Sequence, residues 1–403
     1  MAQSKPKWIQ FSAFATVPLV LVLGNSMLVP VLPDMAKHMK LSELQSSLVI
    51  TLFSVSAGLF IPFIGYLSDR IRRKTVIVPA LALYGAAGIM AGMAAVWDSY
   101  PLLIATRSLQ GLAAAGTAPI AMALVGDMYK DGEESEALGL IEASNGAGKV
   151  ISPIIGSLLG LWSWYAPFFA FPFFCAGSLI AVIFLIKEPK QKEKPLPFKK
   201  YIVEVKAIYA KNLAWLLTAY ASGALGLFIL FGVLFYLSDM VEKPPHSIDG
   251  VAKGGLLAIP LLGLVLTAYT TGRIIKKKLT LMRKLMIAGL SVIVLSLAAA
   301  AIWHRSLIAL IVFVTISSIG TGLLLPCLNT MITGCAERAY RGTVTSFYSS
   351  LRFLGVAAGP PLFSYIADKS VTMLFIILVL LAAASLWLVF RFIHPKEQTA
   401  NSG

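Results

Sequence analysis

Residues 65–74 of the chain read GYLSDRIRRK and separate two apolar stretches, at about 46–67 and 75–96. Each stretch has the ~20 apolar residues that a helix needs to cross the ~30 Å hydrocarbon layer of a membrane. The short connection holds Asp69 and four bases, so it belongs in water or among lipid headgroups, where charged side chains are tolerated. The decapeptide therefore predicts two membrane-spanning helices joined by a charged loop.

Apolar stretches of this kind recur along the 403 residues, of which 58% are hydrophobic and only 13% are charged. Ordinary water-soluble domains carry about 25% charged residues, so a soluble fold is excluded. The pattern predicts an all-α membrane protein with twelve transmembrane helices. The expected spans are 9–32, 46–67, 75–96, 101–126, 137–160, 165–186, 212–238, 251–273, 285–303, 307–333, 342–366 and 371–392.

The basic residues outnumber the acidic ones, which leaves a formal net charge of +15. Bases gathered on one face or stripe would point to nucleic acid, but here they fall in short clusters between the spans, which points to the anionic headgroups of membrane lipids. Cytoplasmic loops of membrane proteins carry the excess of Lys and Arg, and these clusters lie on the same side as both termini. We therefore expect a multi-pass protein of the cell membrane with both termini in the cytoplasm.

The longest connection, at about 188–211, is rich in lysine and divides the chain into two sets of six spans. This predicts an N-terminal six-helix bundle at 1–187, a cytoplasmic linker at 188–211 and a C-terminal six-helix bundle at 212–403. Within the linker, apolar residues recur at helical spacing from Phe198 to Tyr209. The pattern predicts a short interfacial helix on the inner leaflet, for which the residues indicate no regulatory role.

Glycine and proline landmarks indicate that the second bundle repeats the first in parallel, a common signature of secondary transporters. Three landmarks recur at one offset of 207 residues. They are Gly65 and Gly272, which end apolar spans; Pro119 and Pro326, late in the fourth and tenth spans; and the G-x-x-x-[SG]-P segments at 148–153 and 355–360.

Three motifs resemble those of the major facilitator superfamily. The decapeptide at 65–74 resembles its G-x-L-[AS]-D-R-x-G-[RK]-[RK] loop, and Arg107 to Gly111 (RSLQG) is similar to its R-x-x-q-G motif. Residues 148–156 resemble the G-x-x-x-G-P-x-x-G segment associated with antiporters, although helix packing alone would also explain these small residues. The nearest group is the twelve-span drug:proton antiporters.

The resemblance implies two six-helix bundles that rock about a central cavity. It also implies a cytoplasmic latch, in which Asp69 and Arg73 make charge-assisted bonds that form in one conformation and break in the other. Arg72 stands where the family usually has glycine. The sequence therefore leaves open whether the loop forms the same turn and whether the latch forms all of its charge-assisted bonds. Lys276 occupies the position equivalent to Asp69, so the latch is expected in one half only.

Four charged residues, Arg107, Glu142, Lys149 and Arg352, lie deep within the expected spans, away from the span ends. Inserting a charged side chain at that depth of the membrane costs at least ~2.5 to 3.5 kcal/mol. We therefore expect these residues to face the protein interior and treat them as functional candidates. Glu142, Asn145 and Lys149 fall on one face of the fifth helix, and the repeat places Arg352 at the depth of Asn145. We assign proton and conformational coupling to Arg107, Glu142, Asp69 and Arg73, and substrate binding to Asn25, Asn145, Lys149, Arg352 and Gln110.

These residues favour a proton-coupled secondary exporter, a monomer that moves small amphipathic or anionic molecules by alternating access. Three cations face one acid within the spans, which leaves an excess of two positive charges for an anionic partner. Proton-linked uptake of an organic anion and a non-transporting receptor or scaffold remain alternatives, and the buried charges could also serve only to staple helices together. No enzymatic activity, cofactor or metal site is expected, because the histidines and cysteines lack partners at ligand spacing.

Overall fold

The computed structural model describes residues 7–188, 198–242, 244–248, 250–276, 278–335 and 338–394, and over these ranges the secondary structure is entirely helical. The helices are α1 (Lys7–Ser26), η1 (Val29–Val31), α2 (Leu32–His38), α3 (Glu43–Arg70), α4 (Arg73–Val96), α5 (Tyr100–Ala115), α6 (Ala118–Met128), α7 (Asp131–Gly160), α8 (Ala166–Leu185), α9 (Phe198–Glu242), α10 (Gly250–Ile275), α11 (Leu279–Trp303), α12 (Leu307–Gly334), α13 (Arg338–Ala367) and α14 (Val371–Phe392).

The expected all-α membrane fold is confirmed. Within the described residues, ten segments are long and apolar enough to cross a membrane, and one of them combines α5 with α6. The two polar helices α7 and α13 are not among the ten, but each has 30 residues, which is more than a span requires. Together these elements are consistent with the twelve expected spans.

Three differences from the expected spans concern where helices break or join. The first helix was expected to run to residue 32, but α1 ends at Ser26 and the short helices η1 and α2 follow it. The fourth span breaks between α5 and α6 because Pro119, which has no amide hydrogen to donate, lies in the first turn of α6. The linker helix and the seventh span form one 45-residue helix, α9, whereas the seventh span was expected to start at 212.

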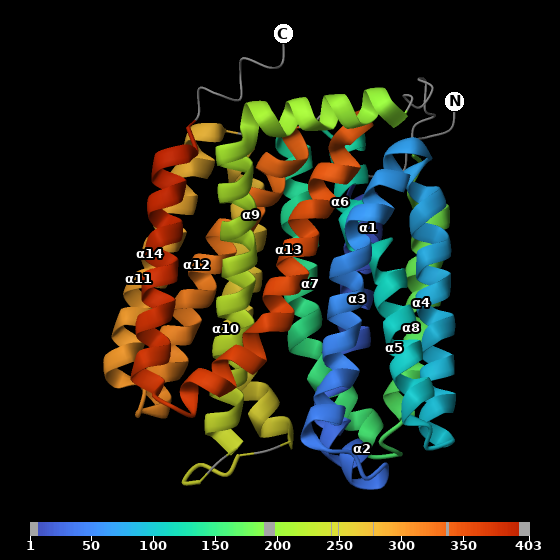
Figure 1. Ribbon diagram of the computed structural model, residues 1–403, viewed down its shortest axis with the longest axis vertical. Helices are drawn as coiled ribbons and strands as arrows, with labels where there is room; N and C mark the ends of the chain where they lie inside the picture. Colours follow the sequence, from blue (N-terminus) through green and yellow to red (C-terminus); the bar gives the residue numbers. More distant parts are fainter. Residues whose placement is uncertain are drawn as a thin grey trace.

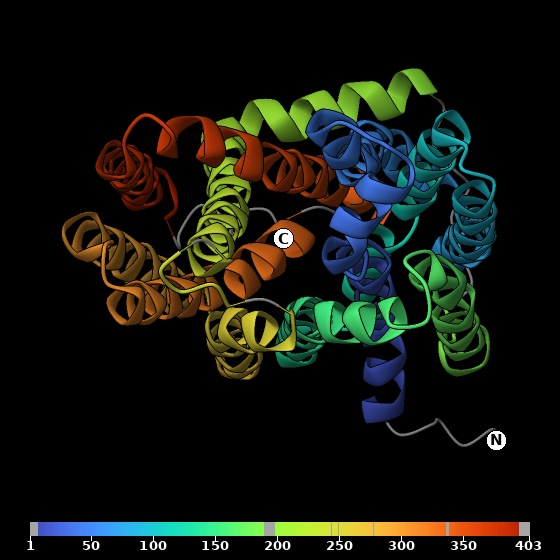
Figure 2. The same ribbon diagram turned by 90° about the horizontal axis from the view of Figure 1, so that it is seen from below.

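The two halves of the chain lie side by side (Figure 1). The start of α1, the end of α14 and the first part of α9 lie at the same end of the helices (Figure 1), which we call the linker end. There the first part of α9 runs across the other helices, along the outer side of α3 and α13 (Figures 1 and 2). Between the halves, α3 packs on α13, α7 packs on α10, and α6 packs on α12 and α13.

The internal repeat is visible in the two closest helix crossings between the halves. A Cβ atom added to Gly65 in α3 would lie 2.0 Å from Ser346 Oγ in α13, and one added to Gly272 in α10 would lie 2.5 Å from the Cα atom of Gly139 in α7. Gly272 and Ser346 stand 207 residues after Gly65 and Gly139, respectively. The two crossings are therefore equivalent contacts of one repeated architecture, and both require glycine because the backbones approach so closely.

Candidate functional site: a central charged cavity and a latch at the linker end

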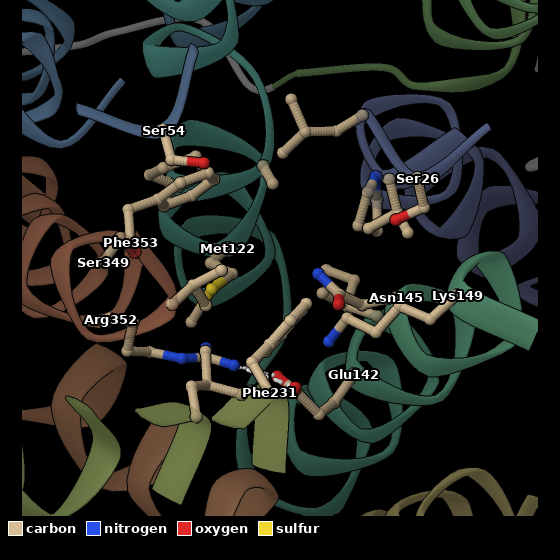
Figure 3. Close-up of a pocket in the computed structure, with 18 of the residues that line it drawn as sticks. Ser26, Ser54, Met122, Glu142, Asn145, Lys149, Phe231, Ser349, Arg352 and Phe353 are labelled. Carbon is tan, nitrogen blue, oxygen red and sulfur yellow. Dashed lines mark hydrogen bonds and ion pairs between the residues drawn. The ribbon is translucent and has the colours of Figure 1, made fainter. Parts of the chain in front are cut away.

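A cavity of about 90 Å³ lies between the two halves, lined by α1, α3, α6 and α7 from one and by α9 and α13 from the other. By this measure a water molecule needs roughly 10 to 15 Å³, so the cavity holds several waters. Most of the wall is apolar, including Phe53, Met122, Phe231 and Phe353. The polar wall residues are Ser26, Ser54, Glu142, Asn145, Lys149, Ser349 and Arg352, and Figure 3 shows them turned toward a shared hollow.

The two halves are joined across the cavity by an ion pair between Glu142 of α7 and Arg352 of α13. The Nη2 atom of Arg352 donates to both carboxylate oxygens of Glu142, at 2.8 and 2.9 Å (Figure 3). Asn329 of α12 donates from Nδ2 to Glu142 Oε2 at 2.9 Å and accepts from Arg352 Nη1 at 3.2 Å. All three residues are buried, so these bonds lie away from screening solvent.

Asn329 is a member of this cluster that the sequence analysis missed. Its amide side chain, three residues after Pro326 in a span without charged residues, was an available signal, because a buried amide needs partners. The repeat offers a second signal, since Met122, which stands 207 residues earlier, also lines the cavity.

Lys149 and Asn145 also face the cavity from α7, as the spacing along the fifth helix predicted. The ammonium nitrogen of Lys149 lies 4.7 Å from the centre of the Phe231 ring, a cation–π arrangement. Within the described residues, no hydrogen bond or ion pair to this ammonium is seen. The cavity wall thus carries two cations and one carboxylate, and the ammonium is available to a ligand.

Arg107 and Gln110 do not line the cavity, so the expected excess of two positive charges falls to one. The side chain of Arg107 is completely buried behind Phe53, with its guanidinium carbon 4.8 Å from the ring centre. It donates to the backbone oxygen of Val49 at 2.9 Å and to Gln110 Oε1 at 2.6 Å. The side chain of Asn25 lies outside the described residues; its backbone belongs to α1.

The latch at the linker end is centred on the buried carboxylate of Asp69. Its Oδ1 accepts from Arg73 Nη1 at 2.8 Å and from the backbone N–H of Gly342 at 2.7 Å. Its Oδ2 accepts from the backbone N–H of Thr343 and from the hydroxyl of Tyr201, each at 2.8 Å. A carboxylate offers about four lone-pair sites, so Asp69 is fully satisfied by donors from both halves.

A second carboxylate extends the latch from α4 to α13. Asp127, at the end of α6, accepts from Arg73 Nε at 3.0 Å and from Arg341 Nη1 at 2.6 Å. The result is an alternating chain of charges, Asp69, Arg73, Asp127 and Arg341, that crosses between the halves. Asp127 and Arg341 were not among the predicted site residues, because only the fold brings these two distant positions together.

Arg72 does not disturb the latch, which answers the question raised by its departure from the family motif. Its backbone is extended, with φ −63° and ψ 133°, a conformation that any residue adopts. Arg72 precedes α4, whose free amides at Arg73 and Lys74 donate to the carboxylate of Glu188 at 2.8 and 3.0 Å. Glycine is therefore not required at position 72.

A family model described as Major Facilitator Superfamily matches residues 14–298 and 246–403 of the chain. The chain belongs to the Major Facilitator Superfamily. One solved structure with a similar fold is that of the human organic anion transporter MFSD10 (TETRAN), with a TM-score of 0.77 over 95% of this chain and 99% of that one. At 19% identity this likeness shows the superfamily's fold alone.

Relatives in the superfamily are exporters and drug-resistance proteins. The chain is 43% identical to the bacillibactin exporter of Bacillus subtilis, over 97% of this chain and 98% of the relative. It is 29% identical to the multidrug efflux protein YfmO of the same organism, over 89% and 85%. It is 25% identical to the quinolone resistance protein NorA of Staphylococcus aureus, over 85% and 87%. The chain is therefore a multi-pass membrane transporter of the efflux type, and not an enzyme.

Proposed function

We propose that this transporter exports small amphipathic or anionic organic molecules from the cytoplasm by exchange for protons, with the linker end facing the cytoplasm. The observation that carries the proposal is the Glu142–Arg352 pair, an ion pair that crosses from one half to the other inside the cavity. The pair joins α7 to α13 through the carboxylate of Glu142. Its strength therefore depends on whether that carboxylate carries a proton. The clustering of bases at the loops of the linker end supports the orientation.

Protonation of Glu142 would couple the proton to the conformation. Ionised Glu142 binds the guanidinium of Arg352 and the amide of Asn329, both from the other half. The protonated carboxyl has no charge and donates instead of only accepting, so its attraction for Arg352 falls. A proton entering from one side would thus loosen the pair, and release on the other side would restore it, as alternating access requires.

The substrate class follows from the wall of the cavity. The ammonium of Lys149, which makes a cation–π contact but no hydrogen bond within the described residues, favours a negatively charged or hydrogen-bond-accepting group. Phe53, Phe231 and Phe353 offer apolar surface to the rest of the molecule. Asn145 and Arg352 are proposed as further substrate contacts on the same wall. Because the relative at 43% identity is named a bacillibactin exporter, bacillibactin is the first candidate to test.

Arg107 is proposed to act in conformational coupling from behind the wall. It ties α5 to α3 through the Val49 carbonyl, and its Gln110 partner donates to the backbone oxygen of Tyr84 in α4 at 3.4 Å. Gln110 is also proposed as a substrate contact, which the substrate reaches when the cavity enlarges past Phe53 during the cycle, and Asn25 of α1 is proposed as another. Asp69 and Arg73 are proposed to hold the linker end closed and to release it when substrate enters from the cytoplasm.

Transport by Glu142→Gln in proteoliposomes tests the coupling. We expect pH-driven uphill movement of bacillibactin to be lost, while downhill exchange persists, because glutamine keeps the shape and can still accept from Arg352. Glu136→Gln is the matched control: it is the same substitution on α7, in an exposed pair with Arg273 at 3.2 Å. It should retain pH-driven transport.

Four outcomes would contradict parts of the proposal. Undiminished pH-driven efflux by Glu142→Gln would remove the coupling role of this residue. Loss of both uphill and downhill transport together with a lower melting temperature would show that the pair only staples the helices. Movement of an organic anion inward along the proton gradient would establish uptake, and no transport by the intact protein would favour a receptor or scaffold.

A further inference from the structure

The first part of α9, residues 198–211, lies across the seam between α3 and α13 at the linker end (Figures 1 and 2). We call it the strap. Its apolar stripe is turned toward the protein: Tyr201 is 4% exposed and Ile202, Val205 and Ile208 pack against the core, whereas Val203 is 64% exposed. The strap is therefore seated on the helix bundle and is more than a loose tether between the halves.

Tyr201 is the strap residue that reaches both halves. Its hydroxyl donates to Asp69 Oδ2 at 2.8 Å and is hydrogen-bonded to the Thr343 hydroxyl. Its ring packs edge-on against Tyr66 of α3, with centres 5.1 Å apart. The same ring packs at a tilt of 40° against Tyr340 of α13, with centres 5.5 Å apart. Asp69 and Tyr66 belong to the first half, whereas Thr343 and Tyr340 belong to the second.

The continuity of α9 gives this contact a mechanical consequence. The strap runs without interruption into the seventh span, which belongs to the second half. Because a helix transmits movement along its length, the strap moves with that half when the halves separate. Opening of the linker end must then break the bond between Tyr201 and Asp69 together with those from Gly342 and Thr343.

We propose that Tyr201 is a positioning residue of the transport cycle, which supplies the fourth donor to the Asp69 carboxylate and thereby stabilises the conformation closed at the linker end. The inference rests on the proposed alternating-access function. In the closed conformation, a missing hydroxyl leaves one buried acceptor site of Asp69 unsatisfied, because no solvent reaches it. In the open conformation, water replaces any lost donor, so removal of the hydroxyl shifts the equilibrium toward opening.

A cysteine-labelling experiment measures this shift without substrate or proton gradient. Ser349 lines the cavity, so Ser349→Cys serves as the reporter in a chain whose Cys175, Cys327 and Cys335 are replaced by alanine. A membrane-impermeant maleimide is added to inside-out and to right-side-out vesicles. We expect Tyr201→Phe to raise the labelling rate from the linker-end face about 10-fold, the effect of one hydrogen bond to a charged group.

Tyr209→Phe is the matched control, since it removes the same group from the same strap. The hydroxyl of Tyr209 bonds to that of Tyr220 at 2.9 Å, and both residues lie in α9, so no contact between the halves is lost. Its labelling rate should match that of the reporter alone. An unchanged rate in Tyr201→Phe, or an equal rise in Tyr209→Phe, would overturn the proposal.

A double-mutant cycle with Asp69→Asn separates positioning from general loosening of the fold. If Tyr201 acts through Asp69, the Tyr201→Phe effect falls to less than about twofold once the carboxylate is gone, because the charged acceptor is no longer present. A full 10-fold effect in the Asp69→Asn chain would refute the positioning role. Labelling does not depend on Glu142, so failure of the proposed proton coupling and failure of this inference are distinguishable.

Discussion

Replacing Gly65 by alanine should open the linker end, because the new methyl group cannot fit at the crossing of α3 and α13. The added Cβ would lie 2.4 Å from Ser346 Cβ and 2.7 Å from the backbone oxygen of Gly342. Ordinary contact starts at 3.4 Å, so the two helices must separate by about 1 Å. Rotation of the Ser346 hydroxyl relieves the shortest overlap but not the one with Ser346 Cβ.

The expected magnitude follows from the cost of overpacking, about 1 to 3 kcal/mol. The cost applies only to the closed conformation, in which the helices touch, so it shifts the equilibrium toward the open one by about 5- to 150-fold. The separation also pulls Gly342 away from Asp69, whose bond to the Gly342 N–H is 2.7 Å long. The two effects act in the same direction.

The assay is the labelling rate of Ser349→Cys from each face of the membrane. Gly65→Ala should raise the rate from the linker-end face and lower it from the opposite face. Gly272→Ala, at the equivalent crossing, should act in the same direction, because its Cβ would lie 2.5 Å from Gly139 Cα. Gly177→Ala is the control, since nothing lies within 4 Å of its Cβ position. Unchanged labelling in both crossing variants would refute the argument.

Two further predictions concern the cavity and the latch loop. Lys149→Gln should raise the apparent KM for an anionic substrate by about 10- to 150-fold, because a hydrogen bond to a charged group contributes about 1.5 to 3 kcal/mol. Initial export rates at varied substrate concentration measure this KM. An unchanged KM would contradict contact between the substrate and Lys149. Arg72→Gly should change the free energy of unfolding by less than about 2 kcal/mol, because the half-exposed Arg72 side chain loses only a 3.9 Å ion pair and a 3.2 Å hydrogen bond, both to Glu188. A larger fall in stability, measured by chemical denaturation, would contradict the assigned loop conformation.

Much of the fold could be predicted from local pattern. Apolar stretches of membrane-spanning length must be helical, since no water is present in the hydrocarbon layer to satisfy exposed backbone groups. The equivalent positions of Gly65 and Gly272 also indicated the repeat, because a close helix crossing requires glycine in each half. The break in the fourth span and the continuous α9 were not anticipated, since helix propensity does not show where a helix bends or joins its neighbour.

The sequence by itself determined which charges lie within the spans and that Glu142, Asn145 and Lys149 share one helix face, because helical spacing is a local property. Only the tertiary structure decided what those charges meet. Arg352 reaches Glu142 while Arg107 is turned away behind Phe53. Asp69 accepts a hydrogen bond from Tyr201, which follows it by 132 residues. Ion pairs and hydrogen bonds act over a few ångströms, so their partners are set by how the helices pack, and a single sequence carries no record of that packing.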